Sequence, residues 1–179
     1  MTTSLETIHL GGGCFWCTES VFLCVRGISE VESGYSNGQV AAPTYEQVCT
    51  GRTGCNEVVQ LRFDPLLISL REILEIFFTI HDPTTLNRQG NDVGTQYRSG
   101  IYFTHPEQEL VAQGVIAELQ QDPAFSRPIV TEVLPLANYW PAEDYHQNYF
   151  AKNPHQGYCM AVAAPKVAKF RQTFARLAR

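Results

Sequence analysis

The segment GGGCFWCTES, residues 11–20, places a cysteine where its thiol can react. Cys14 follows an alternating segment and three glycines and begins an apolar helical pattern, so we expect it at the start of a helix. The unpaired N–H groups and the positive end of the helix dipole stabilise a thiolate there and lower the thiol pKa. Glycines allow a ligand to approach the backbone closely. The pattern favours a reactive thiol over a cysteine that only packs in the core.

A candidate proton donor lies in the segment EVVQLRF, residues 57–63. Strand alternation puts Glu57 at the start of a face whose other side chains are apolar. Such a carboxyl group is partly desolvated, which raises its pKa and keeps it protonated. A protonated carboxyl group can serve as a general acid near neutral pH. The alternative is a solvated glutamate at a strand end.

The surroundings of Cys14 leave other chemistries open. Cys14 and Cys17 have the spacing of a thioredoxin-like redox pair. A zinc site would need a second pair of Cys or His ligands, and a cysteine hydrolase would need a histidine base in a recognisable context. We find neither pattern and expect no metal and no cofactor. Phe15 and Trp16 point about 100° apart on a helix, so at least one ring should border the thiol.

The elements that must position these residues follow from hydrophobic periodicity. We predict strands at residues 5–10, 28–36, 57–63 and 99–104, and helices at 14–27, 70–81 and 106–121, with capping boxes at Ser69/Glu72 and Thr104/Glu107. This order, βαββαβ, is typical of a split βαβ unit. We therefore expect an α+β fold with a ferredoxin-like core, a mixed or antiparallel sheet with packed helices, and a C-terminal extension.

The C-terminal extension and one long loop complete the prediction. The extension should hold a strand at 127–135, a helix after Pro141, the irregular stretch NPHQGY at 153–158 and a helix from Pro165. Residues 82–98, DPTTLNRQGNDVGTQYR, have no periodicity and exceed the usual loop length of a compact domain. Because this loop contains Arg88, Asp92 and Tyr97, we expect an ordered binding loop.

Composition and charge narrow the class of protein. The 179 residues, 44% hydrophobic and 17% charged, fit a single soluble domain spanning 1–179. The formal net charge of −5 and scattered basic residues make nucleic acid an unexpected partner. Without a signal-like segment or an apolar run of about 20 residues, we expect no membrane contact and a cytoplasmic monomer. Six cysteines in that reducing compartment indicate packing, metal or redox roles.

Seven segments spread over nearly the whole chain resemble one family. They are GGGCFWCTE (11–19), GYSNG (34–38), PTYEQVCTG (43–51), NEVVQLRFDP (56–65), HDPTTLNRQGNDVGTQYRS (81–99), PAEDYHQNY (141–149) and NPHQGYC (153–159). Together they resemble the peptide methionine sulfoxide reductases of the A type. The GCFW core and the NDxGTQYRS loop are the most specific of them. The resemblance implies an oxidoreductase that reduces the S epimer of free and protein-bound methionine sulfoxide.

The resemblance also implies roles for single residues. Cys14 would attack the sulfoxide sulfur and become a sulfenic acid, while Glu57 would protonate the sulfoxide oxygen. The family positions that hold the S-methyl group, hydrogen-bond the oxygen and supply a carboxylate in the binding loop correspond to Phe15, Trp16, Tyr45, Tyr97 and Asp92. A sulfoxide oxygen carries much negative charge, so such donors would make it a leaving group.

Recycling of the sulfenic acid should use a second cysteine and a thioredoxin-like reductant. We predict Cys159 as the resolving thiol, because Pro154 and Gly157 argue against regular structure and permit movement, and because it matches the family's tail cysteine. Cys17, one turn into the helix of Cys14, is a possible second recycling thiol.

The sequence departs from the family pattern at three points. Cys55 replaces a usual histidine, Cys17 replaces a frequent glycine, and Cys159 is the single cysteine of a tail that often carries two. The alternative function is a thiol redox or peroxide-sensing protein that uses the Cys14/Cys17 pair. That alternative has no need of Glu57, since disulfide exchange has no oxygen to protonate.

Overall fold

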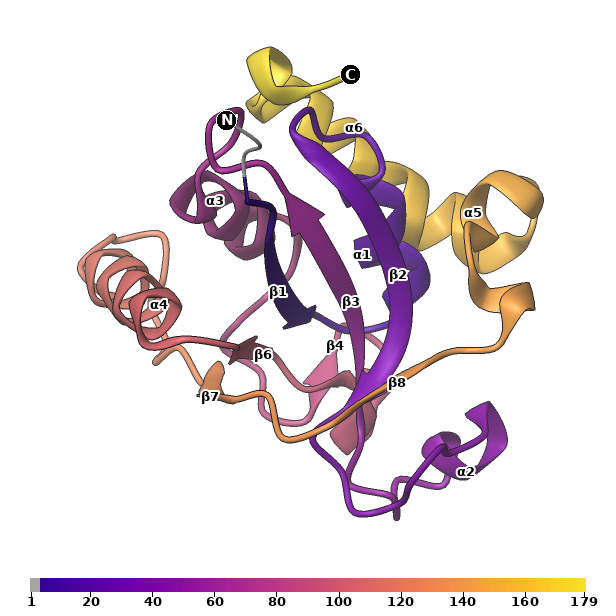
Figure 1. Cartoon of the computed structure of the whole chain (residues 1–179). Coiled ribbons are helices and arrows are strands. Elements are labelled where there is room, and N and C mark those ends of the chain that lie inside the picture. The colour runs from indigo at the N-terminus through magenta and orange to yellow at the C-terminus, as the bar shows by residue number, and fades with distance from the viewer. Residues whose placement is uncertain (1–3) are drawn as a thin grey trace.

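The computed structural model describes residues 4–179 and contains one six-stranded sheet and a small hairpin (Figure 1). The sheet strands are β1 (Glu6–Gly11), β2 (Ile28–Ser36), β3 (Asn56–Phe63), β6 (Gly100–Phe103), β7 (Glu132–Pro135) and β8 (Tyr139–Pro141). Their order is β7-β6-β1-β3-β2-β8, and only the β6/β7 pair is parallel. The predicted α+β class with a mixed sheet is confirmed.

Six α-helices accompany the sheet in the described part of the chain. They are α1 (Phe15–Phe22), α2 (Tyr45–Cys49), α3 (Leu70–Ile80), α4 (Pro106–Gln120), α5 (Tyr149–Lys152) and α6 (Ala164–Thr173). In Figure 1, α1, α3 and α6 lie against one face of the central strands. There the side chains of Ile8, Leu61, Phe22, Phe77 and Phe170 are fully buried and form part of one hydrophobic core. Burial of this face fixes the strand register and therefore the side on which Glu57 points.

One of the two predicted capping boxes forms. The predicted capping box before α3 forms, because the Ser69 side chain accepts from the Glu72 N–H and the Glu72 carboxylate accepts from the Ser69 N–H. The predicted box at Thr104/Glu107 is wrong. His105 occupies the N-cap position of α4, and the Thr104 hydroxyl instead bonds the Gln108 side chain at 3.3 Å.

Helix α1 ends at Phe22, five residues before the predicted end at Gly27. The cause is tertiary pairing with the C-terminus of the chain. Val25 forms a β-bridge with Ala178, and the Arg26 N–H donates to the Leu177 carbonyl at 2.8 Å. These bonds satisfy backbone groups that a longer helix would have paired internally.

The C-terminal extension differs from the prediction in three places. The strand predicted at 127–135 forms only over β7, because the Val130 N–H donates to the Pro83 carbonyl at 2.8 Å and so joins the long loop. The helix after Pro141 is a 3₁₀ turn (Asp144–His146) followed by α5. The predicted irregular stretch is helical from residue 157, and a π-helical turn (Cys159–Ala163) leads directly into α6.

The long loop at residues 82–98 is ordered, as predicted. It contains a hairpin of β4 (Arg88–Gln89) and β5 (Asp92–Val93), followed by a 3₁₀ turn (Thr95–Tyr97). The Gln89 side chain bonds both backbone groups of Asp82 at 2.9 Å, which closes the loop on its own base. The hairpin and the 3₁₀ turn after it thus hold Asp92 and Tyr97 in defined positions. Within residues 4–179, no helix has both the length and the apolar character that crossing a bilayer requires.

Candidate functional site

Cys14 occupies the N-cap position of α1, directly after β1 and the glycine turn. Gly13 has a φ of 96°, and a Cβ there would lie 2.7 Å from the Gln89 side chain. The glycine is therefore required both by its backbone conformation and by the close approach of the long loop. The Cys14 side chain is nearly buried, with 9% of its surface exposed.

The prediction of a lowered thiol pKa at Cys14 is wrong. Burial raises the pKa of this thiol well above its usual value, and the carboxylate of Glu57 raises it further. The helix start does supply a backbone N–H, from Trp16, that favours the thiolate, but its effect is smaller. Desolvation outweighs the helix terminus because the thiolate would lie almost out of contact with water. In the resting protein the thiol therefore keeps its proton.

Glu57 lies beside Cys14 and is the buried acid that the sequence predicts. Its side chain is 1% exposed, and Oε1 accepts a hydrogen bond of 3.2 Å from the backbone N–H of Phe15. Oε2 is buried and has no hydrogen-bond partner among the described residues. Burial raises the pKa of Glu57 to about 8, so the group is mostly protonated at neutral pH. The predicted raised pKa is confirmed.

Two tyrosines from different elements lie within electrostatic reach of this acid. Tyr45 is the first residue of α2, and Tyr97 ends the 3₁₀ turn of the long loop. Burial raises the pKa of both hydroxyls, and the negative charge of Glu57 is the next contribution to each. Both hydroxyls therefore remain protonated donors. The fold brings Cys14, Glu57, Tyr45 and Tyr97 within electrostatic reach of one another.

Asp92 connects the long loop to the C-terminal segment. Its Oδ2 accepts a hydrogen bond of 2.6 Å from the hydroxyl of Tyr158, the residue before Cys159. Its charge also raises the pKa values of Glu57 and Cys14. Asp92 therefore lies at the predicted site, where it bonds the tail.

The two rings after Cys14 have different environments. Phe15 is 1% exposed and packs near Tyr35, with ring centroids 5.7 Å apart. Trp16 is half-buried and stacks on Tyr149, with centroids 3.8 Å apart and planes 6° from parallel. Phe15 is therefore part of the core beside Cys14, while Trp16 is partly exposed.

The sequence reasoning did not single out three aromatic residues that line this region, His146, Tyr149 and Tyr158. His146 accepts a hydrogen bond from the Trp16 indole, and Tyr158 lies edge-on to that ring at 5.9 Å. The available signal was the pair of segments PAEDYHQNY and NPHQGYC, in which the sequence assigned no role to the aromatic residues. No periodicity in those segments indicates which side chains point toward Cys14.

The two candidate recycling thiols lie on the same side of α1. Cys17 is 1% exposed, and its thiol contacts the Tyr158 hydroxyl at 3.6 Å. Cys159, at the start of the π-helical turn, is fully buried, and its N–H donates to the Gln156 side chain at 3.0 Å. All six cysteines are unpaired in this structure. Cys159 therefore lies in helical structure, whereas the sequence indicated irregular structure before it.

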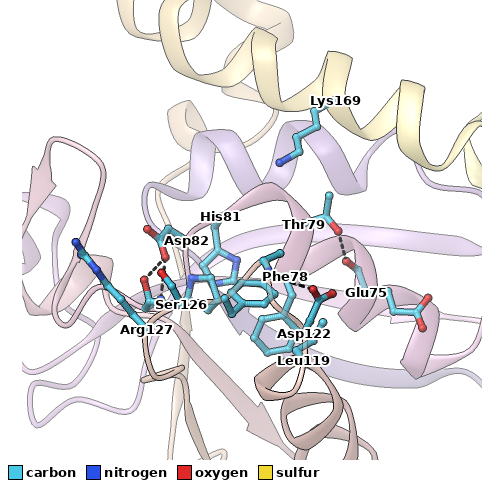
Figure 2. Close-up of a pocket in the computed structure, with 14 residues that line it drawn as sticks. Glu75, Phe78, Thr79, His81, Asp82, Leu119, Asp122, Ser126, Arg127 and Lys169 are labelled. Atoms are coloured by element: carbon cyan, nitrogen blue, oxygen red, sulfur yellow. Dashed lines mark hydrogen bonds between the residues drawn. The ribbon is translucent and has the colours of Figure 1, made fainter.

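A cavity of about 850 Å³ lies elsewhere, between the ends of α3 and α4 and helix α6 (Figure 2). Figure 2 shows Lys169 projecting from α6 above His81 and Asp82. None of the residues that line the cavity belongs to the cluster around Cys14. Its side chains are of mixed charge, and the buried His81 is already bonded to the Ser99 hydroxyl at 2.8 Å. The chemistry of the chain is concentrated at Cys14 and not in this cavity.

Comparison with known proteins agrees with this geometry. The sequence model of the family peptide methionine sulfoxide reductase matches residues 6–178. The peptide methionine sulfoxide reductase MsrA of Trichodesmium erythraeum is 57% identical over 170 residues, which cover 95% of this chain and 96% of that protein.

Solved structures show the same likeness. The crystal structure of Mxr1 from Saccharomyces cerevisiae in reduced form has a TM-score of 0.82 at 37% identity, covering 91% of this chain and 93% of that one. A structure of Mxr1 in complex with Trx2 has a TM-score of 0.57 at 27% identity, covering 83% and 87% of the two chains. With the family's sequence model matching almost the whole chain, the protein belongs to the peptide methionine sulfoxide reductases of the A type, thiol-dependent oxidoreductases that reduce methionine sulfoxide.

Proposed function

We propose that Cys14 is the nucleophile and Glu57 the general acid of methionine sulfoxide reduction. The Cys14 sulfur attacks the sulfoxide sulfur and forms an S–S bond, while the Glu57 proton moves to the sulfoxide oxygen and the thiol proton of Cys14 passes to the Glu57 carboxylate. The hydroxyl group then transfers from the substrate sulfur to the Cys14 sulfur: an S–O bond to Cys14 forms, and the S–O and S–S bonds to the substrate sulfur break. Cys14 is left as a sulfenic acid and the substrate leaves as a thioether, so the sulfoxide oxidises the thiol by two electrons. The observation that carries this assignment is the Oε2 atom of Glu57, which is buried near Cys14 and has no hydrogen-bond partner among residues 4–179. A protonated oxygen in that place is a preorganised donor to the sulfoxide oxygen.

The substrate is held, in this proposal, by its methyl group and its oxygen. Phe15 and Trp16 enclose the methyl group, and the hydroxyls of Tyr45 and Tyr97 donate to the oxygen. Asp92 contributes a carboxylate at the rim. Because the sulfur is chiral and is fixed at two of its substituents, only one epimer, the S form, presents its sulfur to Cys14. Reduction of a racemic mixture should therefore stop when about half is consumed; consumption beyond half by this enzyme alone would contradict the assignment.

We further propose that Cys159 resolves the sulfenic acid and that a thioredoxin reduces the resulting disulfide. Contacts between the π-helical turn and α1, and the Tyr158–Cys17 contact, support a short path between the thiols. The existence of a Mxr1 structure in complex with Trx2 supports the choice of reductant. Cys17 can accept the disulfide by thiol exchange and pass it outward.

A ferredoxin-like core is also part of the proposal. Its support is the run β6-β1-β3-β2, which is antiparallel throughout and has α1 after β1 and α3 after β3. In that arrangement Glu57 lies in β3, and Cys14 follows the neighbouring strand β1 after the glycine turn. The pairing of β1 with β3 therefore brings the two residues together.

The test of the catalytic pair is single-turnover reduction of methionine-S-sulfoxide, followed by the loss of free thiol. Glu57→Gln should slow this step by a factor on the order of 10² to 10⁴, the usual range for a lost general acid. The matched control is Glu19→Gln, since Glu19 is also 1% exposed but bonds the Ser33 hydroxyl at 3.1 Å. A Glu57→Gln rate equal to that of the wild type would show that Glu57 is structural.

A further inference from the structure

His146 is buried against Trp16 and has no part in the steps proposed above. Its side chain is fully buried, and Nδ1 accepts a hydrogen bond of 2.9 Å from the indole Nε1–H of Trp16. Its ring also lies near those of Phe15, Tyr45 and Tyr145, at centroid distances of 5.1, 4.4 and 4.0 Å. His146 thus touches both the wall and the oxygen-binding side of the proposed substrate pocket.

The hydrogen bond to Trp16 determines the protonation of the histidine ring. Because Nδ1 accepts, it carries no proton, and the neutral ring must hold its proton on Nε2. Burial lowers the pKa of His146, so the ring resists a second proton, although the carboxylates of Glu143 and Glu46 oppose this effect. Nε2 has no partner among the described residues. A buried N–H without a partner is unfavourable, so within residues 4–179 the bond to Trp16 is the side-chain hydrogen bond that accounts for the position of the ring.

The segment that carries His146 is anchored to the central sheet. The Ala142 N–H donates to the Ser33 carbonyl at 2.9 Å, and the Gln147 side chain bonds both backbone groups of Ser33 at 2.9 Å. Ser33 is a fully buried residue of β2. The His146 N–H completes the 3₁₀ turn by donating to the Glu143 carbonyl at 2.9 Å. The backbone that carries the His146 ring is therefore held against the sheet by hydrogen bonds and is not part of an unattached loop.

The other contacts of Trp16 do not determine its orientation alone. Tyr149 stacks on the indole face and Tyr158 lies against it at 78°. A stacked pair tolerates rotation of the indole within its plane, because stacking depends mainly on overlap and separation. A hydrogen bond from Nε1 does not tolerate that rotation, because it needs the N–H to point at one atom. Among the described residues, His146 is the partner of the indole N–H, and this bond requires the Trp16 rotamer that points Nε1 at His146.

We propose that His146 is a positioning residue that fixes Trp16 in one rotamer and thereby sets the size of the methyl pocket. The inference rests on the proposed role of Trp16 in holding the S-methyl group. A pocket with a fixed wall admits a methyl sulfoxide and disfavours a larger alkyl group on the same sulfur. If Trp16 can rotate, its ring moves aside and the pocket accepts a larger alkyl group on the sulfoxide sulfur. His146 then controls substrate selectivity without touching the reacting atoms.

The test compares kcat/KM for methionine-S-sulfoxide and ethionine-S-sulfoxide with dithiothreitol as reductant. Wild-type enzyme should prefer the methyl substrate by a factor on the order of 10 or more, since one methylene in a tight pocket is worth about 10- to 200-fold. His146→Leu, which lacks an acceptor, should reduce this ratio several-fold. His146→Asn should retain most of it, because the Asn Oδ1 can replace Nδ1 as the acceptor.

The matched control is His9→Leu. His9 is also a buried histidine, 2% exposed, with a single side-chain hydrogen bond to Gln60 at 3.0 Å, and it lies on β1 beside Tyr139. This variant should lower the melting temperature without changing the methyl-to-ethyl ratio. A histidine with a merely structural role would behave in the same way. The ratio therefore separates positioning from stability.

The outcomes distinguish this inference from the proposed function. If the wild type itself does not discriminate, the methyl pocket is misassigned and both fail. If the wild type discriminates and His146→Leu keeps the same ratio, the pocket stands and the role of His146 is overturned. If His146→Leu does not fold, ¹⁵N NMR of the wild-type His146 imidazole tests the inference instead, because it shows which ring nitrogen carries the proton. A neutral ring protonated on Nε2 and hydrogen-bonded to Trp16 supports the inference, and a proton on Nδ1 overturns it.

Discussion

At the scale of residues, burial shifts the pKa values of Cys14 and Glu57 in the same direction, but the consequence for the two groups differs. It raises both pKa values, so the resting site holds a thiol and a carboxylic acid in place of two anions. A neutral Glu57 removes the repulsion that a carboxylate would exert on a developing thiolate. Negative charge then develops at Cys14 and Glu57 only when a sulfoxide oxygen is present to accept the Glu57 proton. The acid was predictable from strand parity, whereas the high thiol pKa required knowledge of how deeply the helix start is buried.

The thiol of Cys14 should be indispensable. Cys14→Ser replaces the sulfur with a hydroxyl that is far less nucleophilic and cannot form a sulfenic acid. We expect complete loss of sulfoxide reduction with an unchanged fold, measured by methionine production and by circular dichroism. Substantial residual turnover in the folded variant would refute the mechanism.

Glu57 should reduce the stability of the folded protein. Its pKa is about 8 in the folded state against 4.5 as the ordinary value, so between these pH values the folded state must keep a proton that the unfolded chain has released. Wild-type stability therefore falls as pH rises from about 5 to 8. Glu57→Gln lacks this cost and can keep the bond from the Phe15 N–H, so it should be more stable by on the order of 3 kcal/mol at pH 7.

Urea unfolding of wild type and Glu57→Gln at several pH values measures this difference. The two free energies of unfolding should be similar near pH 4 and should separate up to pH 8. The same titration predicts that wild-type activity declines above about pH 8, where Glu57 loses its proton. A constant gap between the two proteins across this range would show that Glu57 has an ordinary pKa.

At the scale of elements, patterns within one segment predicted most of the helices and strands, whereas contacts between distant segments left no pattern in the sequence. The Ser69/Glu72 box and the alternation of β2 and β3 depend on residues within one element, and both predictions hold. The end of α1 depends on pairing with the C-terminus, and the length of β7 depends on a bond from Val130 to the long loop. Those partners are more than 40 residues away, so no pattern within the segment could reveal them.

The capping box of α3 should contribute to stability but not to catalysis. Ser69→Ala removes the side-chain acceptor for the Glu72 N–H and should lower the free energy of unfolding by about 1 kcal/mol. The box lies at the start of a helix whose contacts are with the core, α4 and α6. Chemical denaturation should show the loss while kcat and KM for methionine sulfoxide stay at wild-type values. A loss of kcat in Ser69→Ala that accompanies the loss of stability would show that the N-terminus of α3 influences the active site.

At the scale of the whole molecule, the site is assembled from distant parts of the chain. Cys14 comes from the start of α1, Glu57 from the central sheet, Asp92 and Tyr97 from the long loop, and Tyr158 from the tail. Sequence patterns located the first pair and marked the long loop as a binding loop, but the roles of single loop residues came from the resemblance to a family, because a loop has no periodicity. The single domain spanning 1–179, the monomeric state and the cytoplasmic location remain predictions.

The recycling path depends on how the tail moves over the rest of the molecule. Cys159 is fully buried in a π-helical turn, a feature often found at functional sites, and the preceding Tyr158 is tied to Asp92 by a bond of 2.6 Å. The approach of Cys159 to Cys14 is therefore coupled, in this proposal, to the Tyr158–Asp92 bond and to the π-helical turn. Cys17 is already near Cys14 in α1, but bridging the N-cap and the first turn demands a particular Cα and Cβ geometry.

We therefore predict that Cys159→Ser completes one turnover, retains the sulfenic acid on Cys14 and fails with thioredoxin as the sole reductant. Trapping with a sulfenic-acid reagent and mass spectrometry after one equivalent of sulfoxide measure the first two results. Cys17→Ser is the matched control and should still form the Cys14–Cys159 disulfide, since only the later exchange step uses Cys17. If Cys159→Ser instead gives a Cys14–Cys17 disulfide and continues to turn over with thioredoxin, the pair within α1 is the resolving system and the tail need not move.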